Sequence, residues 1–187
     1  MHYPISRLAL SGAAAVTALT LTVPTASATS TYDGHARNYG HTRVVVAKPV
    51  TKLLTGAGIK VAPTGAATAR PYRNTVAASF PIRKIRDHKM VFLHRGGLRF
   101  SGGGASITTA RFTVSLPKLR VTGRVSGSEL GRVGRVVLFT IHKTDRPRLG
   151  DAKLELTGTA AKAFNATFGV KAFSKGDTFG YATVSPR

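Results

Sequence analysis

The stretch Met90-Val-Phe-Leu-His-Arg-Gly-Gly-Leu-Arg-Phe-Ser101 decides the fold class of this chain, because two short apolar strands flank a pair of glycines. Glycine readily adopts the positive φ angles that a two-residue hairpin turn requires. We therefore predict a β-hairpin that turns at Gly96-Gly97. In that register His94 faces Arg99 across the hairpin, and the two side chains share one side of the strands.

A second hairpin is predicted directly after the first, because apolar and polar residues alternate with a period of two from Thr108 to Leu116. Pro117-Lys118 turns the chain, and the alternation resumes at Leu119. A two-residue loop places Phe112 opposite Gly123, where the aromatic ring can cover the bare glycine backbone.

The same loop places Arg111 opposite Arg124 on the polar side of the hairpin, with Arg120 opposite Ser115 nearby. Like charges in direct cross-strand contact oppose strand pairing. Two guanidinium groups on adjacent strands can instead share a carboxylate or a phosphate, although both side chains can equally extend into water. The candidate ligand-binding residues are therefore His94, Arg99, Arg111, Arg120 and Arg124.

The rest of the chain predicts a mainly β fold with two short helices. Pro49 suits the first turn of a helix over residues 49–56, and helical apolar spacing predicts a second helix over 159–168. Residues 64–73 predict a loop, and Val133–Ile141, apolar on both faces, predicts a central strand. We expect an antiparallel β-sandwich or a strongly twisted sheet. Further strands are predicted at Val44–Val46, Ile59–Val61, Val76–Ile82, Ala152–Thr157 and Phe179–Val184.

The N-terminus predicts an export signal. Arg7 is followed by an apolar run from Leu8 to Val23 and then by Ala26-Ser27-Ala28, a small-residue pattern typical of signal-peptide cleavage. The run contains Ser, Gly and Thr and is shorter than the ~20 apolar residues of a membrane span. We expect a signal peptide at 1–28, a flexible leader at 29–41 and a single β-rich domain at 42–187. The mature protein is then secreted.

Positive charge dominates the composition, with 28 Lys and Arg against 7 Asp and Glu and a formal net charge of +21. Charge of this size attracts polyanions, and for an exported protein the nearest are anionic cell-wall polymers, acidic glycans and anionic lipids. The same charge can also serve solubility alone. The chain lacks the interleaved aromatic and basic residues that stack bases, so specific nucleic-acid binding is not expected.

Neither catalysis nor metal binding is expected from the residues. The chain has no Cys, and its histidines do not cluster at spacings that build a metal site. It has no Gly-x-Ser-x-Gly motif and no paired carboxylates, and Gly102-Gly103-Gly104 lacks the Gly-Lys-Ser/Thr ending of a phosphate loop. The composition therefore favours a non-catalytic, envelope-associated binding or structural module that contacts anionic cell-wall polymers.

Several short segments, taken in order, carry a family resemblance. They are Phe80-Pro81-Ile82, His94-Arg95-Gly96-Gly97-Leu98, Val137-Leu138-Phe139, Leu156-Thr157-Gly158, the run Ala163 to Gly169, and Gly180-Tyr181-Ala182. Over residues 42–187 they resemble a family of secreted actinobacterial proteins, itself distantly similar to HtaA-type haem-binding domains, which carry a His-x-Gly-x-Leu element after an apolar strand.

That resemblance implies that His94 supports a haem-ligating tyrosine. From the residues themselves, His94 with Arg99 could hold a small anion or a haem propionate. The segment that would supply the tyrosine, Pro49 to Gly58, contains neither Tyr nor Trp. No cofactor is therefore expected from the residues themselves. The alternative function is an HtaA-like protein that binds haem or another small ligand on the same sheet.

Overall fold

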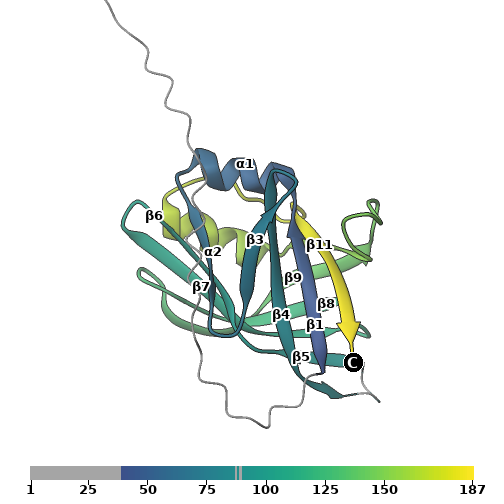
Figure 1. Cartoon of the computed structure of the whole chain (residues 1–187). Coiled ribbons are helices and arrows are strands. Elements are labelled where there is room, and N and C mark those ends of the chain that lie inside the picture. Colours follow the sequence, from purple (N-terminus) through teal and green to yellow (C-terminus); the bar gives the residue numbers. More distant parts are fainter. Residues whose placement is uncertain (1–38, 87, 89) are drawn as a thin grey trace, which may run out of the picture.

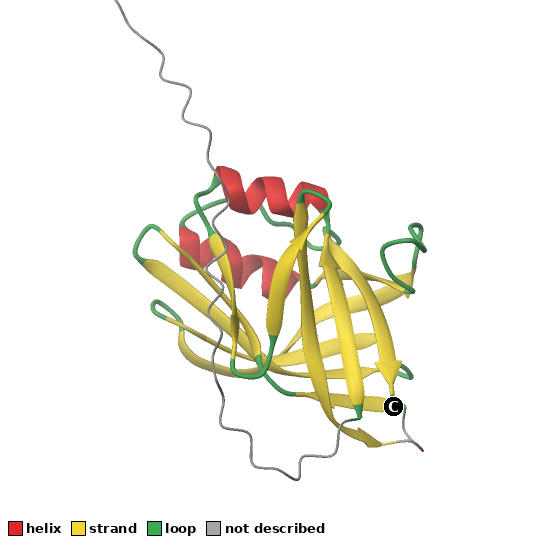
Figure 2. Ribbon diagram, viewed as in Figure 1, coloured by secondary structure: helices red, strands yellow, loops and turns green. Residues whose placement is uncertain are grey.

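The computed structural model describes residues 39–86, 88 and 90–187, and the fold of this part of the chain is mainly β (Figures 1 and 2). Eleven strands join one sheet, and two helices lie near one end of it. The strands are β1 (Gly40–Val46), β2 (Lys60–Thr64), β3 (Thr68–Tyr72), β4 (Thr75–Arg86), β5 (Val91–His94), β6 (Gly97–Gly102), β7 (Ala105–Ser115), β8 (Arg120–Gly127), β9 (Gly131–Lys143), β10 (Ala152–Leu156) and β11 (Thr178–Pro186). The helices are α1 (Lys48–Gly56) and α2 (Gly158–Phe168).

Pairing between β7 and β8 closes the sheet into an antiparallel barrel of eight strands. The ring runs β7-β5-β4-β1-β11-β10-β9-β8 and returns to β7. The mainly β class and the two short helices are confirmed. Of the two expected architectures, the strongly twisted antiparallel sheet is also confirmed and the β-sandwich is wrong. The physical reason is strand length: β4, β7 and β9 have 12, 11 and 13 residues, and long twisted strands coil until the sheet meets its own edge.

Three further strands extend the barrel at one end, and the helices cover that end. β3 pairs with the first half of β4, while β6 and then β2 continue from the first half of β7. Helix α2 inserts Phe164 beside Phe100, with ring centroids 4.8 Å apart in an edge-to-face arrangement. This aromatic contact fills the covered end of the barrel, so the remaining interior lies toward the opposite end.

The predicted hairpin at Gly96-Gly97 is wrong, because β5 and β6 do not pair with each other. They lie one after the other along the same edge of β7. The glycines allow close approach instead of a tight turn: a Cβ on Gly97 would meet the backbone of Thr109 and Ala110. Gly96 has φ +71° and lies against the backbone of residues 64 and 67. The pair therefore bends one continuous strand edge.

The second hairpin is confirmed near its turn and differs farther along. Val114 pairs with Val121 and Ser115 with Arg120, as predicted. A β-bulge then places Arg111 and Phe112 together opposite Gly123. Phe112 does cover Gly123, because a Cβ built there would lie 3.1 Å from its ring. The bulge removes the predicted pairing of Arg111 with Arg124, and Ala110 takes that position.

Most other elements agree with the sequence. Both helices are confirmed, and β9 pairs on both edges as a central strand does, although Val133 is 44 % exposed. The predicted loop over 64–73 is wrong, because β3 forms a hairpin with β4. Arg73 and Asn74 make its turn at φ 45° and 62°, a tight-turn conformation that a search for glycine pairs overlooks.

The predicted signal peptide and residues 29–38 of the predicted leader lie outside the described residues. Tyr39 to His41 are described, and β1 already begins at Gly40. In the part of the chain that the structure describes, no helix is long and apolar enough to span a membrane.

The close approach of β6 and β7 gives a stability prediction. Gly97→Ala should lower the free energy of unfolding by roughly 1–3 kcal/mol, because the new methyl group meets backbone atoms that cannot rotate away. Urea denaturation followed by circular dichroism measures this change. Gly103→Ala, where a Cβ would have no neighbour within 4 Å but φ is +58°, controls for backbone strain alone. A smaller loss at Gly97 than at Gly103 would contradict the close packing.

Candidate functional site: a cavity inside the barrel

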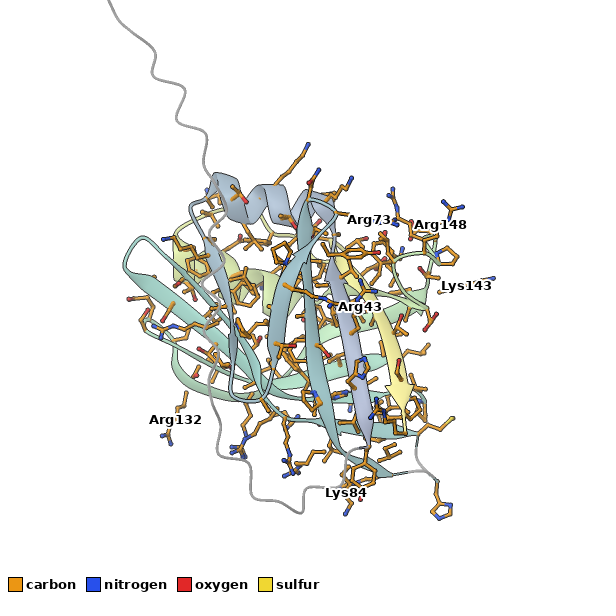
Figure 3. All side chains as sticks on the ribbon, viewed as in Figure 1. Arg43, Arg73, Lys84, Arg132, Lys143 and Arg148 are labelled. Carbon is orange, nitrogen blue, oxygen red and sulfur yellow. The ribbon has the colours of Figure 1, made fainter. Side chains whose placement is uncertain are left out.

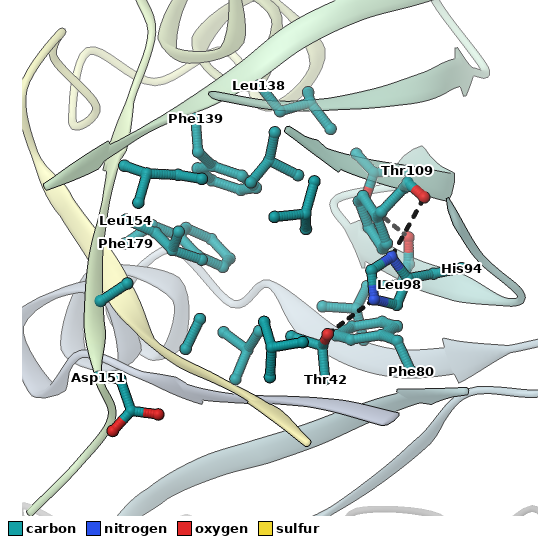
Figure 4. Close-up of a pocket in the computed structure, with 18 of the residues that line it drawn as sticks. Thr42, Phe80, His94, Leu98, Thr109, Leu138, Phe139, Asp151, Leu154 and Phe179 are labelled. Atoms are coloured by element: carbon teal, nitrogen blue, oxygen red, sulfur yellow. Dashed lines mark hydrogen bonds between the residues drawn. The ribbon is translucent and has the colours of Figure 1, made fainter. Parts of the chain in front are cut away.

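The barrel encloses a cavity of about 330 Å³ whose lining is almost wholly apolar (Figure 4). The polar residues among those that line it are Thr42, His94, Thr109 and Asp151. The apolar lining consists of Val44, Phe80, Leu98, Phe100, Phe112, Val114, Leu116, Val121, Leu138, Phe139, Ile141, Ala152, Leu154, Phe164, Phe179, Ala182 and Val184.

Strand alternation explains why this interior is apolar. Along β7, Phe112 and Val114 point inward and are buried, whereas the intervening Thr113 points outward. Small residues leave the space open, since Ala152 and Ala182 face the cavity from adjacent positions on β10 and β11. The cavity is therefore a product of the same period-two pattern that predicts the strands.

His94 is the one imidazole in this lining, and it is only 3 % exposed. Its Nδ1 lies 3.3 Å from the carbonyl oxygen of Phe112, and its Nε2 lies 2.7 Å from Oγ1 of Thr42. A carbonyl can only accept, so Nδ1 donates to Phe112, and in a neutral ring Nε2 then accepts from the Thr42 hydroxyl. Both ring nitrogens are therefore used within the protein.

Burial lowers the pKa of His94 from its ordinary 6.5 to about 4, although hydrogen bonds to the backbone of Phe112 and Phe92 partly oppose the shift. The imidazole is consequently neutral at neutral pH. Its two buried hydrogen bonds join β5, which carries His94, to β1 and β7.

One end of the cavity carries a carboxylate. Asp151 is exposed and lies across the cavity from His94 (Figure 4). Leu116 and Val184, both half-buried, also line the cavity. None of the described residues that line the cavity is Lys or Arg. The Lys and Arg side chains of the described residues therefore lie outside this cavity.

The structure separates the predicted site residues. His94 points into the barrel, whereas Arg99 is exposed on β6 and donates from Nη2 to Oγ of Ser106 at 3.3 Å. The expectation that they share one side of a hairpin is wrong, because no such hairpin forms. Arg111 and Arg124 are exposed and Arg120 is half-buried, and their role in binding an anion stays a prediction.

Sequence reasoning missed Arg135 on β9, which stands directly opposite Arg124. Its Nη1 donates to Oγ1 of Thr113 and of Thr122, at 3.0 and 3.2 Å, and its Nη2 donates to the carbonyl of Arg111 at 3.1 Å. Partial burial, and then the charges of Arg124, Arg111 and Arg83, lower the pKa of Arg135. No local signal in the sequence identifies this residue, because a register shift between Val125 and Ser126 sets its position opposite Arg124.

The fold is shared with solved structures. The C-terminal domain of HtaA from Corynebacterium glutamicum is similar with a TM-score of 0.54 and 14% identity, covering 78% of this chain and 94% of that one. The haem-binding protein HtaB from the same organism is similar with a TM-score of 0.52 and 13% identity, covering 79% and 91%. No known family model matches the chain, and no curated protein matches it in sequence. The resemblance to HtaA-type domains is confirmed at the level of fold.

The buried imidazole makes stability depend on pH. His94 takes up a proton near pH 6.5 in the unfolded chain but only near pH 4 in the folded one, so acid favours unfolding. Its contribution of roughly 3 kcal/mol is complete above pH 6.5 and is lost as pH falls toward 4. Denaturant titrations should show a smaller loss between pH 7 and 4 for His94→Gln than for the native chain. An NMR titration of the imidazole that gave a pKa near 6.5 would contradict this.

Proposed function

We propose that this chain is a non-catalytic binding protein that holds a small, uncharged, apolar ligand inside the barrel. The observation that carries this proposal is the cavity of about 330 Å³ with its apolar lining. Cavities of about 300–1,000 Å³ with a few placed polar groups are typical of small-molecule sites. Eight-stranded barrels are just wide enough to hold one such molecule.

The polar groups of the cavity determine which ligand charge the cavity can accept. A buried ion needs a partner of opposite charge, because desolvation is costly. Neutral His94 cannot supply one inside the barrel. Asp151 repels an anion, and because it is exposed it is not a buried partner for a cation. A hydroxyl or carbonyl on the ligand could still reach Thr109, whose own hydrogen bond to Leu98 is long at 3.5 Å. The proposed ligand is thus neutral, with at most one or two polar groups.

Haem is the ligand that the comparison with HtaB suggests, but the residues of this cavity do not fit it. The described lining contains no Tyr, Cys or Met that could ligate iron, and both nitrogens of His94 are already hydrogen-bonded. It also contains no cation to pair with a propionate. We therefore propose the small-ligand function without haem, in a protein that the N-terminal sequence directs out of the cell.

A cavity-filling substitution tests this function. Ala182→Phe should abolish binding of a neutral apolar compound, such as a medium-chain alcohol, because the new ring occupies the cavity that Ala182 lines. Thr183→Phe changes the adjacent, outward-facing residue of β11 and should retain binding. Thermal unfolding with graded ligand is the measurement, with a stabilisation of about 2.7 kcal/mol at a hundredfold excess over Kd.

Two results would contradict the proposal. One is that no neutral compound raises the melting temperature of the native chain. The other is that Ala182→Phe and Thr183→Phe respond to the ligand equally. The corresponding carboxylic acid should stabilise the protein less than the alcohol, because the cavity offers it no cation.

A second function, association with anionic cell-wall polymers, is favoured by the outer face of β7, β8 and β9. There Arg111 and Arg124 lie beside Arg135, and Arg83 is close enough to help lower the pKa of Arg135. Figure 3 shows Lys84, Arg132 and Arg148 at widely separated edges of the molecule, so positive charge is also spread over the rest of the surface. A polymer phosphate or carboxylate bound between the guanidinium groups would remove their mutual repulsion.

The cluster gives opposite expectations for stability and binding. Arg124→Thr should raise the melting temperature slightly in plain buffer, since it removes a like-charge pair with Arg135 that costs up to ~1 kcal/mol. The same change should weaken retention on isolated cell wall more than Arg148→Thr, which alters an exposed loop residue. Salt-dependent elution measures the retention. Equal losses of retention in the two variants would mean that diffuse surface charge, and not this cluster, binds the polymer.

A further inference from the structure

We propose that the open rim of the barrel is a docking surface for an anionic lipid bilayer. The rim consists of Met90, Leu119 and the cations Arg86, Lys118 and Arg120 beside them. The inference extends the proposed function, because it identifies the surface from which an apolar ligand would enter, and in that respect it rests on that function.

Two large apolar side chains stand out at this rim. Met90 is 53 % exposed and Leu119 is 58 % exposed. Their backbones have φ angles of 41° and 42°, a region that bulky residues rarely adopt. Asn or Gly would relieve this conformation and would be more soluble. Exposed apolar side chains in such a conformation point to a functional use of this surface.

Backbone hydrogen bonds connect Met90 and Leu119 to residues that line the cavity. The backbone N–H of Leu116 donates to the carbonyl of Met90 at 3.2 Å, and the N–H of Leu119 donates to the carbonyl of Leu116 at 3.1 Å. The N–H of Ile141 donates to the carbonyl of Leu119 at 2.8 Å. Leu116 and Ile141 both line the cavity. The exposed apolar side chains therefore flank the end through which a ligand would pass.

Positive charge completes the surface. A groove of about 480 Å³ runs beside the β7–β8 turn, and its charged residues are Arg86, Lys118 and Arg120. Thr113, Ser115 and Thr122 add hydroxyl groups to the same groove. None of the described residues that line this groove is acidic. Cations and hydroxyls next to exposed apolar side chains match a phosphate headgroup above acyl chains.

The cations of this surface favour binding to an anionic bilayer over a neutral one. Its two exposed apolar side chains favour a bilayer over a wall polymer. A polymer phosphate would satisfy the cations but would leave Met90 and Leu119 in water. An anionic phospholipid surface satisfies both features at once. It also presents the apolar molecules that the proposed cavity would accept.

The test uses protein isolated after export, with N-terminal sequencing to confirm that residues 1–28 are absent. Co-sedimentation is measured with vesicles of phosphatidylcholine alone and of phosphatidylcholine mixed with phosphatidylglycerol. The rim variant is Met90→Asn with Leu119→Asn, because Asn tolerates positive φ and should leave the fold intact. The matched control is Leu53→Asn with Val133→Asn, which removes two exposed apolar side chains elsewhere, on α1 and β9.

We expect the native protein to bind the mixed vesicles and to bind pure phosphatidylcholine weakly. The rim variant should lose at least about tenfold in affinity for mixed vesicles, while the control keeps native affinity. Both variants should be retained on immobilised heparin, a polyanion, as strongly as the native protein is. Binding of the neutral ligand in buffer should also be unchanged, so failure of the docking surface is separable from failure of the cavity.

Three results would overturn the proposal. The first is native protein that does not bind the mixed vesicles. The second is a rim variant that binds them as the native protein does, which would leave diffuse charge as the cause. The third is a rim variant whose affinities for heparin and for vesicles fall to the same degree, which would mean that the rim binds a polymer.

Discussion

The bulge at Arg111 and Phe112 is the constraint on which the barrel and its cavity both depend. It bends β7 so that one edge can pair first with β6 and then with β5, while the other edge pairs with β8 on both sides of the bulge and closes the ring. The same bulge presents the Phe112 carbonyl to Nδ1 of His94 and lays the Phe112 ring over Gly123. Closure of the sheet and the orientation of the buried imidazole thus follow from one irregularity in one strand.

The strands and helices were largely predictable, because each depends on local periodicity. The turn at Pro117-Lys118 even fixed the right register for the residues next to it. Closure was not predictable, since the pairings of β7 with β5 and of β1 with β4 and β11 join strands that are not neighbouring hairpins of the sequence. The glycine pair Gly96-Gly97 was misleading for a related reason: glycine marks a need for backbone freedom or for close approach, and the sequence alone does not distinguish the two.

The candidate site was predictable only in part. His94 was singled out, but its environment depends on whether β5 pairs with β6 or with β4 and β7. A hairpin puts the imidazole next to Arg99 in water, whereas the observed pairing puts it beside Thr42 inside the barrel. The cavity had no local signal at all, because its lining comes from strands spread along the whole chain. Arg135 was hidden in the same way, since its neighbours belong to β7 and β8.

Alternation along the strands separates two chemistries that composition alone mixes. The net charge of +21 directs attention to polyanions, yet the residues that face inward are apolar and the cations face outward. Burial then decides the state of the one basic group that does face inward, because desolvation keeps His94 neutral. An apolar interior and a cationic exterior meet at the end of the barrel where Leu116 connects Met90 to Leu119. The cavity alone does not imply an anionic partner, and the positive charge alone does not imply an apolar ligand. Their proximity at this end of the barrel is the physical reason to connect ligand binding with an anionic surface.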